Sequence, residues 1–248
     1  MKILVPTKRV PDTDQRIALR PDARQIDDAQ LPYVINPFDA IAIEEAIRIR
    51  ETGPDTVEIL TVGIGSEAYE KELRSGLAMG ADRALRVGCT EPLDPWNVAR
   101  ILQQVVALET PDLVLMGKQA VDDDSNQAGQ FLAALLDWPQ ATFASKIERV
   151  EEGLRVERET DAGIETVRLP LPAVVTTDLR LNEPRYASLP SILRARKKPL
   201  AELTLDQLGV SLEPRVELLS LEVPAAGRSC RRVDSVTELG DALEEVLP

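Results

Sequence analysis

"DLVLMGKQAVDDDSNQAGQFLAALLDW", residues 112–138, combines an apolar run, a polar loop and an amphipathic helical pattern. The apolar run at 112–116 predicts a buried strand that ends at Gly117, and a helix is expected to begin near Ser125 or Asn126. In an open parallel sheet, ligands bind beyond the carboxyl ends of the strands, where N–H groups at helix starts face an anion. This loop offers a glycine for close backbone approach and donors for a phosphate or a ribose, namely Gly117, Lys118, Ser125, Asn126 and Gln127. The alternative is a solvated loop whose aspartates cap the helix.

The three consecutive aspartates of this loop also raise the question of a metal site. Calcium-binding loops alternate their acids and need a glycine and a distal glutamate, which are absent in register here, so we expect no metal. The loop also lacks the GxxxxGK[ST] motif, and no GxGxxG follows the first strand. Elsewhere in the chain, Gly63 and Gly65 stand directly before the helix that Ser66 can cap, and such glycines are typical of a tight turn between a strand and a helix.

The same alternation of strand and helix extends over the first 140 residues. Strands are predicted at 2–6, 57–62, 84–87 and 112–116. Asn36 can cap a helix with Pro37 at its first position, and Glu44 can pair with Arg48. Further helices are expected from Ser66 to Gly80 and after Asp94 and Pro95. This spacing predicts an α/β fold with a mostly parallel, Rossmann-like sheet covered by helices on both faces.

The alternation of strands and helices ends near residue 142. Short charged strands separated by "EEG" and "DAG" predict an antiparallel β meander at about 142–170, and "PAVVTTDL" at 172–179 predicts a buried strand. Beyond Pro199 few segments show the apolar periodicity of a strand or helix, until a last helix is predicted at 236–247. We therefore expect a nucleotide-binding domain at 1–199 and a C-terminal arm at 200–248, either disordered or ordered by a partner.

Composition narrows the class of protein. The 248 residues carry a formal net charge of -13, which argues against nucleic acid or an anionic membrane as a partner. No apolar run reaches the length of a bilayer span, and the apolar stretch in "MKILVPTKRV" is short for a signal peptide, so a cytoplasmic location is expected. Histidine is absent, and Cys89 and Cys230 lie outside any CxxC motif, so no catalytic set can be assembled.

A basic stretch stands out in this acidic chain. Between residues 180 and 198 there are six cationic side chains and one acid, Glu183. The same stretch carries Leu189 directly before Pro190. The residues by themselves suggest an exposed interaction segment, and the alternative is that Leu189 is an ordinary core residue.

Several stretches together resemble the beta subunit of electron transfer flavoprotein. They are "KRVPD" at 8–12, "NPFDAIAIEEAIRI" at 36–49, "LAMGADRAL" at 77–85, "GKQAVDDDSNQAGQ" at 117–130, "DWPQATFASK" at 137–146, and the long run "LPAVVTTDLRLNEPRYASLPSILRARKKPL" at 171–200. Three positions depart from the pattern. Ala162 stands where a glycine or an acid is usual, Thr13 where many members carry a tyrosine near the flavin, and Ala128 where a threonine is common.

The resemblance implies a heterodimer whose alpha subunit holds the redox-active FAD, while this subunit binds AMP as a structural nucleotide. Carried over to this sequence, the AMP site comprises Pro6, Asn36, Pro37, Phe38, Asp39, Ile64, Gly117, Lys118, Gln119, Ala120, Val121, Asp122, Asp123, Asp124, Ser125, Asn126, Gln127 and Ala128. These positions lie at the ends of predicted strands, where the pattern of elements already indicates a ligand.

The resemblance also implies partners for the remaining segments. Residues 178–199 become a recognition loop for flavin-dependent dehydrogenases, in which Leu189 inserts into an apolar groove with Arg185, Tyr186, Pro190 and Ile192 around it. The C-terminal arm would lie on the alpha subunit, and electrons would pass on to a quinone oxidoreductase and the respiratory chain. No catalytic residue is expected in this subunit.

Two other functions remain open at this point. One is the beta subunit of a bifurcating electron transfer flavoprotein, with FAD in place of AMP and NADH as the electron donor. The other is a stand-alone adenine-nucleotide sensor that needs no flavoprotein partner. The sequence "DDDSNQAGQ" favours the AMP type.

Overall fold

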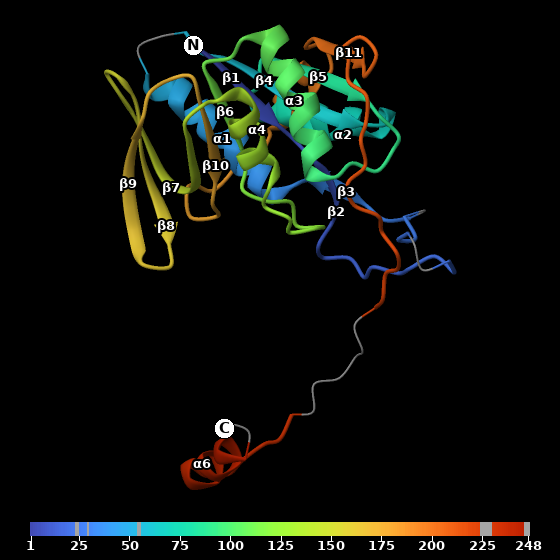
Figure 1. Ribbon diagram of the computed structural model, residues 1–248, viewed down its shortest axis with the longest axis vertical. Helices are drawn as coiled ribbons and strands as arrows, with labels where there is room; N and C mark the ends of the chain where they lie inside the picture. Colours follow the sequence, from blue (N-terminus) through green and yellow to red (C-terminus); the bar gives the residue numbers. More distant parts are fainter. Residues whose placement is uncertain (23–24, 29, 54–55, 224–229, 246–248) are drawn as a thin grey trace. The chain divides into compact units, whose positions relative to one another are not determined.

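A nine-stranded sheet dominates the computed structural model of the chain, with the strand order β11-β5-β4-β1-β6-β10-β7-β8-β9 (Figure 1). The structure describes residues 1–248 except 23–24, 29, 54–55, 224–229 and 246–248. From β11 to β7 every neighbouring pair is parallel. The strands of this part are β1 (Lys2–Pro6), β4 (Glu58–Gly65), β5 (Arg83–Gly88), β6 (Leu113–Gly117), β10 (Ala173–Thr177) and β11 (Leu200–Thr204). The predicted α/β class with a mostly parallel sheet is confirmed.

Helices cover both faces of the parallel strands, as the continuous apolar runs require. Ile3 and Val5 share one buried cluster with α1 (Pro37–Thr52) and α2 (Glu70–Met79). Leu4 belongs to the other cluster, with α3 (Pro95–Glu109) and α4 (Ala128–Leu136). Successive side chains of a strand point to opposite faces, so one short apolar run supplies both layers of the core. Each such buried side chain contributes roughly 1.5–3 kcal/mol.

The order of the strands creates a switch point beside β1. After β1 the chain builds β4 and β5 on one side of it, and α3 then carries the chain to β6 on the other side. Crossovers that leave in opposite directions open a crevice at the carboxyl ends of the strands they flank. The ends of β1, β4 and β6 therefore border one crevice.

Element boundaries differ from the expected ones in several places. The short strands β2 (Arg9–Pro11) and β3 (Tyr33–Ile35) form a separate two-stranded sheet that is too short to show a period in the sequence. A 3₁₀ turn, η1 (Glu67–Tyr69), precedes α2, and Ser66 makes no side-chain cap. Helix α4 begins at Ala128, later than Ser125 or Asn126.

The β meander is present and continues the main sheet. It consists of β7 (Gln140–Val150), β8 (Gly153–Thr160) and β9 (Gly163–Leu169). The first residues of β7 pair with β10 in parallel, and the later ones pair with β8 in antiparallel orientation. The register of the β7–β8 pairing shifts between Ala144 and Lys146.

The boundary expected at residues 199 and 200 does not match the structure. Leu200–Thr204 is β11, which pairs with β5 along its length and forms the edge of the sheet. Its mixed burial gives no clear strand pattern in the sequence, because an edge strand is only partly covered. One compact unit comprises Met1–Ile17 and Asp28–Glu217, and a second comprises Ala18–Asp27 and Leu218–Pro248.

Two short helices complete the described elements. α5 (Leu189–Ala195) lies in the stretch predicted as a recognition loop, and Ser188 caps it by accepting from the Ser191 N–H. α6 (Val236–Glu244) corresponds to the expected last helix, whose residues 246–247 lie outside the described part. Within the ranges that the structure describes, no helix is long and apolar enough to cross a membrane.

Candidate functional site

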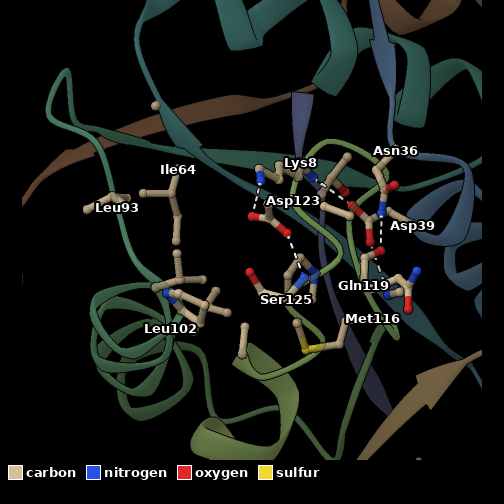
Figure 2. A pocket seen from close by; sticks show the side chains of 18 of the residues that line it. Lys8, Asn36, Asp39, Ile64, Leu93, Leu102, Met116, Gln119, Asp123 and Ser125 are labelled. Atoms are coloured by element: carbon tan, nitrogen blue, oxygen red, sulfur yellow. Dashed lines mark hydrogen bonds and ion pairs between the residues drawn. The ribbon is translucent and has the colours of Figure 1, made fainter. Parts of the chain in front are cut away.

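A cavity of about 380 Å³ opens at the carboxyl ends of β1, β4 and β6 (Figure 2). Sites for small molecules have volumes of about 300–1000 Å³, so the cavity can hold one. Thirteen of the residues expected at a nucleotide site line it: Pro6, Asn36, Asp39, Ile64, Gly117, Lys118, Gln119, Ala120, Asp123, Ser125, Asn126, Gln127 and Ala128. Pro37, Phe38, Val121, Asp122 and Asp124 are not among the lining residues.

The cavity has an apolar part and a polar part. Figure 2 shows Ile64, Leu93 and Leu102 gathered on one side and Lys8 and Asn36 on the other. The apolar side comes from the end of β4 and from α3 with the turn before it. The polar side comes from the residues after β1, the start of α1 and the loop after β6. A ligand with a flat apolar group and a polar group matches this division.

Asp39 connects the end of β1 to the end of β6. Its carboxylate accepts the Lys8 N–H at 2.7 Å and the Gly117 N–H at 3.0 Å. Burial raises the pKa of Asp39 to about 7, although these two N–H groups and Asn36 act in the opposite direction. The residue therefore holds two strand ends in place at a cost in desolvation.

Asn36 does not act as the helix cap that its position suggests. Its side chain makes no cap to α1 and instead reaches across to the loop. The amide donates to the Gln119 carbonyl at 2.9 Å and accepts the Val121 N–H at 3.2 Å. Asn36 does occupy the N-cap position before Pro37, as predicted, but its side chain bonds to the loop instead of the helix, because the loop offers it a donor and an acceptor.

The three aspartates do not cap α4 either. The N-cap of this helix is Gln127, without a side-chain cap. Asp122 and Asp123 bind Lys8 Nζ at 2.8 and 2.9 Å, while Asp124 accepts from Gln119 at 2.7 Å. The mutual repulsion of the run is thus relieved by a cation from the end of β1.

Lys118 is also already paired. Its Nζ lies 2.7 Å from Asp178 and stands over the rings of Phe38 and Phe143, with Nζ-to-centroid distances of 5.3 and 4.8 Å. The buried Phe38 therefore supports the site from behind the cavity wall. Both lysines that line the cavity have committed carboxylate partners.

Sequence reasoning missed fifteen of the residues that line the cavity. These are Thr7, Lys8, Val62, Gly65, Ser66, Tyr69, Cys89, Thr90, Glu91, Leu93, Pro95, Val98, Leu102, Met116 and Gly129. The glycine pair at 63 and 65 was the available signal. A Cβ on Gly63 would approach the Tyr69 ring to 2.9 Å, and one on Gly65 would overlap it, so both glycines make room for a ring that lines the cavity.

The stretch at 178–199 is less basic in the structure than in the sequence. Arg180 pairs with Glu159, Arg185 pairs with Glu44 and Glu51, and Lys198 donates to the carbonyls of Leu77 and Ala81. The charges of Arg180 and Arg185 are thus offset by glutamates distant in sequence, which a linear count of charges does not show, whereas Arg194, Arg196 and Lys197 are exposed.

The apolar side chains of this stretch point outward. Tyr186 is 96% exposed, Leu189 69% and Ile192 41%, so the interpretation of Leu189 as a core residue is wrong. Pro190 is exposed as well. Arg185 differs from them, because its guanidinium is turned onto α1.

Two further expectations can be located. Thr13 is exposed in the turn after β2 and does not line the cavity. In the part of the chain that the structure describes, no group of three or more cysteine, aspartate or glutamate side chains could hold a metal ion.

The fold and the cavity define a class: a doubly wound α/β protein with a small-molecule site at the switch point of its sheet. Residues 24–208 match the family model described as the electron transfer flavoprotein domain. The chain is 49% identical to the electron transfer flavoprotein subunit beta of Bradyrhizobium diazoefficiens, over 98% of both chains. It is 46% identical to the mitochondrial subunit beta of Arabidopsis thaliana, over 98% of both, and 43% identical to the subunit beta of Homo sapiens, over 99% of this chain and 98% of that one. The chain belongs to the electron transfer flavoprotein beta-subunit family.

Proposed function

We propose that this chain is one half of a heterodimeric electron carrier and that its cavity binds AMP as a structural nucleotide. Its partner is an alpha subunit that holds the redox-active FAD, whose isoalloxazine ring carries the electrons. The observation that supports AMP most directly is the cavity at the ends of β1, β4 and β6, lined by the loop after β6. No catalytic role is assigned to this chain.

The charges around the cavity favour a single phosphate. The charged lining residues are Lys8, Lys118, Asp39, Glu91 and Asp123, and both lysines already hold carboxylates. A diphosphate or triphosphate needs additional cations to offset its charge. One phosphate can instead be bound by backbone N–H groups at the start of α4, while the base occupies the apolar side. This distribution supports a nucleoside monophosphate such as AMP over a nucleoside diphosphate or triphosphate.

Counting the bound cofactors tests this proposal. The heterodimer purified after coexpression with the alpha subunit is denatured, and the released flavin and nucleotide are quantified. One FAD and one AMP per heterodimer is expected. Two FAD and no AMP would indicate the bifurcating type, and a stable lone chain that retains ATP and binds no alpha subunit would indicate a nucleotide sensor.

We further propose that the outward face of α5 docks flavin-dependent dehydrogenases, which supply the electrons. Tyr186, Leu189, Pro190 and Ile192 are exposed apolar residues of this face, and Arg194, Arg196 and Lys197 are exposed beside them. A small apolar anchor with a polar rim gives specificity to a transient interface. Electrons would then pass to a quinone oxidoreductase. The residues after Glu217 would pack on the alpha subunit. We expect the heterodimer to be located in the cytoplasm.

Leu189→Ala tests the docking surface. Loss of an interface anchor costs at least about 2 kcal/mol, so kcat/KM for the dehydrogenase should fall by roughly thirtyfold, with FAD and AMP content unchanged. Leu108→Ala is a matched control, because Leu108 is 60% exposed but belongs to α3. Unchanged electron transfer in Leu189→Ala would refute the anchor role.

A further inference from the structure

Lys8 stands at the meeting point of three segments that form the polar side of the cavity. Its backbone N–H binds Asp39, and its carbonyl accepts the Asn36 N–H at 2.9 Å. Its side chain extends to the loop after β6, where Nζ lies 2.8 Å from Asp122 Oδ1. It also lies 2.9 Å from Asp123 Oδ2 (Figure 2). One residue thus contacts the start of α1 through its backbone and the loop through its ammonium group.

The loop needs such a contact because of its backbone conformation. Asp124 and Asn126 both have φ of 48°, in the left-handed region, which aspartate and asparagine adopt more readily than other non-glycine residues but still at a small cost. Asp123 lies directly before this pair, and its second oxygen accepts the Ser125 N–H at 3.0 Å. Asp123 therefore connects Lys8 to the turn that carries Ser125 and Asn126 to the cavity.

Lys8 has little capacity left for a direct role in holding an anion. Two carboxylates already surround its ammonium group, and together they outweigh its charge. Although burial alone would lower the pKa of Lys8, the hydrogen bonds that it donates to Asp122 and Asp123 raise it. The cation stays charged and directed at the loop.

We propose that Lys8 is a positioning residue: through Asp122 and Asp123 it holds the loop at 118–127 in the conformation that retains the nucleotide. This proposal rests on the proposed function for its ligand, but the effect of Lys8 on the loop does not depend on which ligand binds. Exposed ion pairs contribute little individually. Here a single lysine is shared by two carboxylates, and one of these is also bonded to the strained turn.

The test uses the heterodimer and the dissociation rate of radiolabelled AMP. Lys8→Met removes the charge while keeping the length of the side chain, and it should accelerate AMP release at least tenfold. Lys8→Arg should stay within threefold of the unaltered protein. Lys2→Met is the matched control, because Lys2 begins β1, whereas Lys8 follows its other end, and Lys2 pairs with Glu109 at 3.3 Å, so AMP release should be unchanged.

Asp123→Asn separates positioning from a direct contact with the ligand. If Lys8 positions the loop, removal of the Asp123 charge weakens the clamp and accelerates AMP release. If Lys8 or the local field binds the phosphate directly, removal of a nearby negative charge slows release. Slower release in Asp123→Asn would overturn the proposal, as would AMP release from Lys8→Met within twofold of the unaltered protein.

Amide hydrogen exchange of the nucleotide-free heterodimer gives a measurement that needs no ligand. Exchange at Val121 and Ser125 should be faster in Lys8→Met and unchanged in Lys2→Met. Unchanged exchange in Lys8→Met would overturn the positioning role even if AMP were lost. If the unaltered heterodimer bound no AMP, the proposed nucleotide would be wrong, and the exchange rates alone would decide the role of Lys8.

Discussion

Asp39 illustrates how a single buried carboxyl can shape a site from its interior. The residue is 6% exposed. Its carboxylate accepts the N–H of Lys8, which follows β1, and the N–H of Gly117, the last residue of β6. Desolvation opposes its ionisation, and the two N–H donors favour it. Its protonation is therefore coupled to the integrity of the crevice.

Asp39 should give stability an unusual dependence on pH. Its pKa is about 7 in the folded chain and 3.8 as its ordinary value, so the folded state holds the extra proton between these limits. The stabilisation that comes from this proton is complete below pH 3.8 and is lost as the pH rises through 7. It amounts to a few kcal/mol, because the free energy of unfolding changes by roughly 1.4 kcal/mol per pH unit between the two pKa values. Urea denaturation of the unaltered protein and of Asp39→Asn at several pH values measures it. The stability difference between them should fall from pH 4 to pH 7, and a difference that rises would contradict the assignment.

Gly117 is required for close packing at the end of β6. A Cβ there would overlap Asp39 Oδ1 and lie 2.7 Å from the Phe38 Cβ. Gly117→Ala should therefore cost about 1–3 kcal/mol of stability and lower AMP retention, measured by thermal denaturation and nucleotide content. Gly240→Ala serves as the control, because nothing lies within 4 Å of its Cβ position, and it should be neutral or slightly stabilising.

At the scale of elements, the recognition stretch is anchored on α1. Arg185 binds Glu44 and Glu51, each at 2.7 Å, and the Asn182 amide donates to Glu45 at 2.9 Å. Although burial alone would raise it, hydrogen bonds from Arg185 and Arg48 hold the pKa of Glu44 below its usual range. Arg185 therefore lies against α1, while its neighbours Tyr186 and Leu189 stay exposed.

Arg185→Met should loosen this anchor. Glu44 is only 2% exposed and would keep Arg48 alone as its cationic partner, so a loss of about 1–3 kcal/mol is expected. Limited proteolysis at 178–188 should become faster. Arg180→Met is the control, because the Arg180 side chain is 74% exposed and its pair with Glu159 lies on the surface. Arg185→Lys should recover little, since an ammonium group cannot bridge both glutamates as a guanidinium does. Equal protease resistance of Arg185→Met and the unaltered protein would refute the anchor.

At the scale of the whole molecule, both buried clusters belong to one compact unit. Their members lie between Met1 and Leu212, and β11 closes one edge of the sheet. The residues after Glu217 contribute no side chain to these clusters within the described part of the chain. The stability of the cavity should therefore not depend on them.

A chain that ends after Glu217 should keep its fold and its nucleotide but bind the alpha subunit less tightly. Thermal denaturation, AMP content and the dissociation constant of the heterodimer measure these three properties. A chain that ends after Pro199 is the informative comparison, because it also loses β11 and exposes the edge of β5. It should unfold at lower temperature or aggregate. If the two truncations behaved alike, β11 would not stabilise the sheet.

Much of the fold was predictable because its signals are local. The apolar runs predicted β1, β6 and β10, the turns at "EEG" and "DAG" predicted the meander, and the alternation of strands with helices predicted a parallel sheet. The loop after β6 was recognisable from Gly117 and its polar continuation. The edge strand β11 and the small β2–β3 sheet were missed, because short or half-covered strands have no strong period.

Local sequence accounts for the long strands and helices and for the polar loop after β6, because each of these depends on neighbouring residues. Only the tertiary structure decided which charges are neutralised. Lys8 lies 114 and 115 positions from its two aspartates, and Arg185 lies 141 from Glu44. Such pairs form only when the sheet brings the ends of distant strands together, so a composition of charges cannot show whether a cation is free to bind a partner or already holds a loop in place.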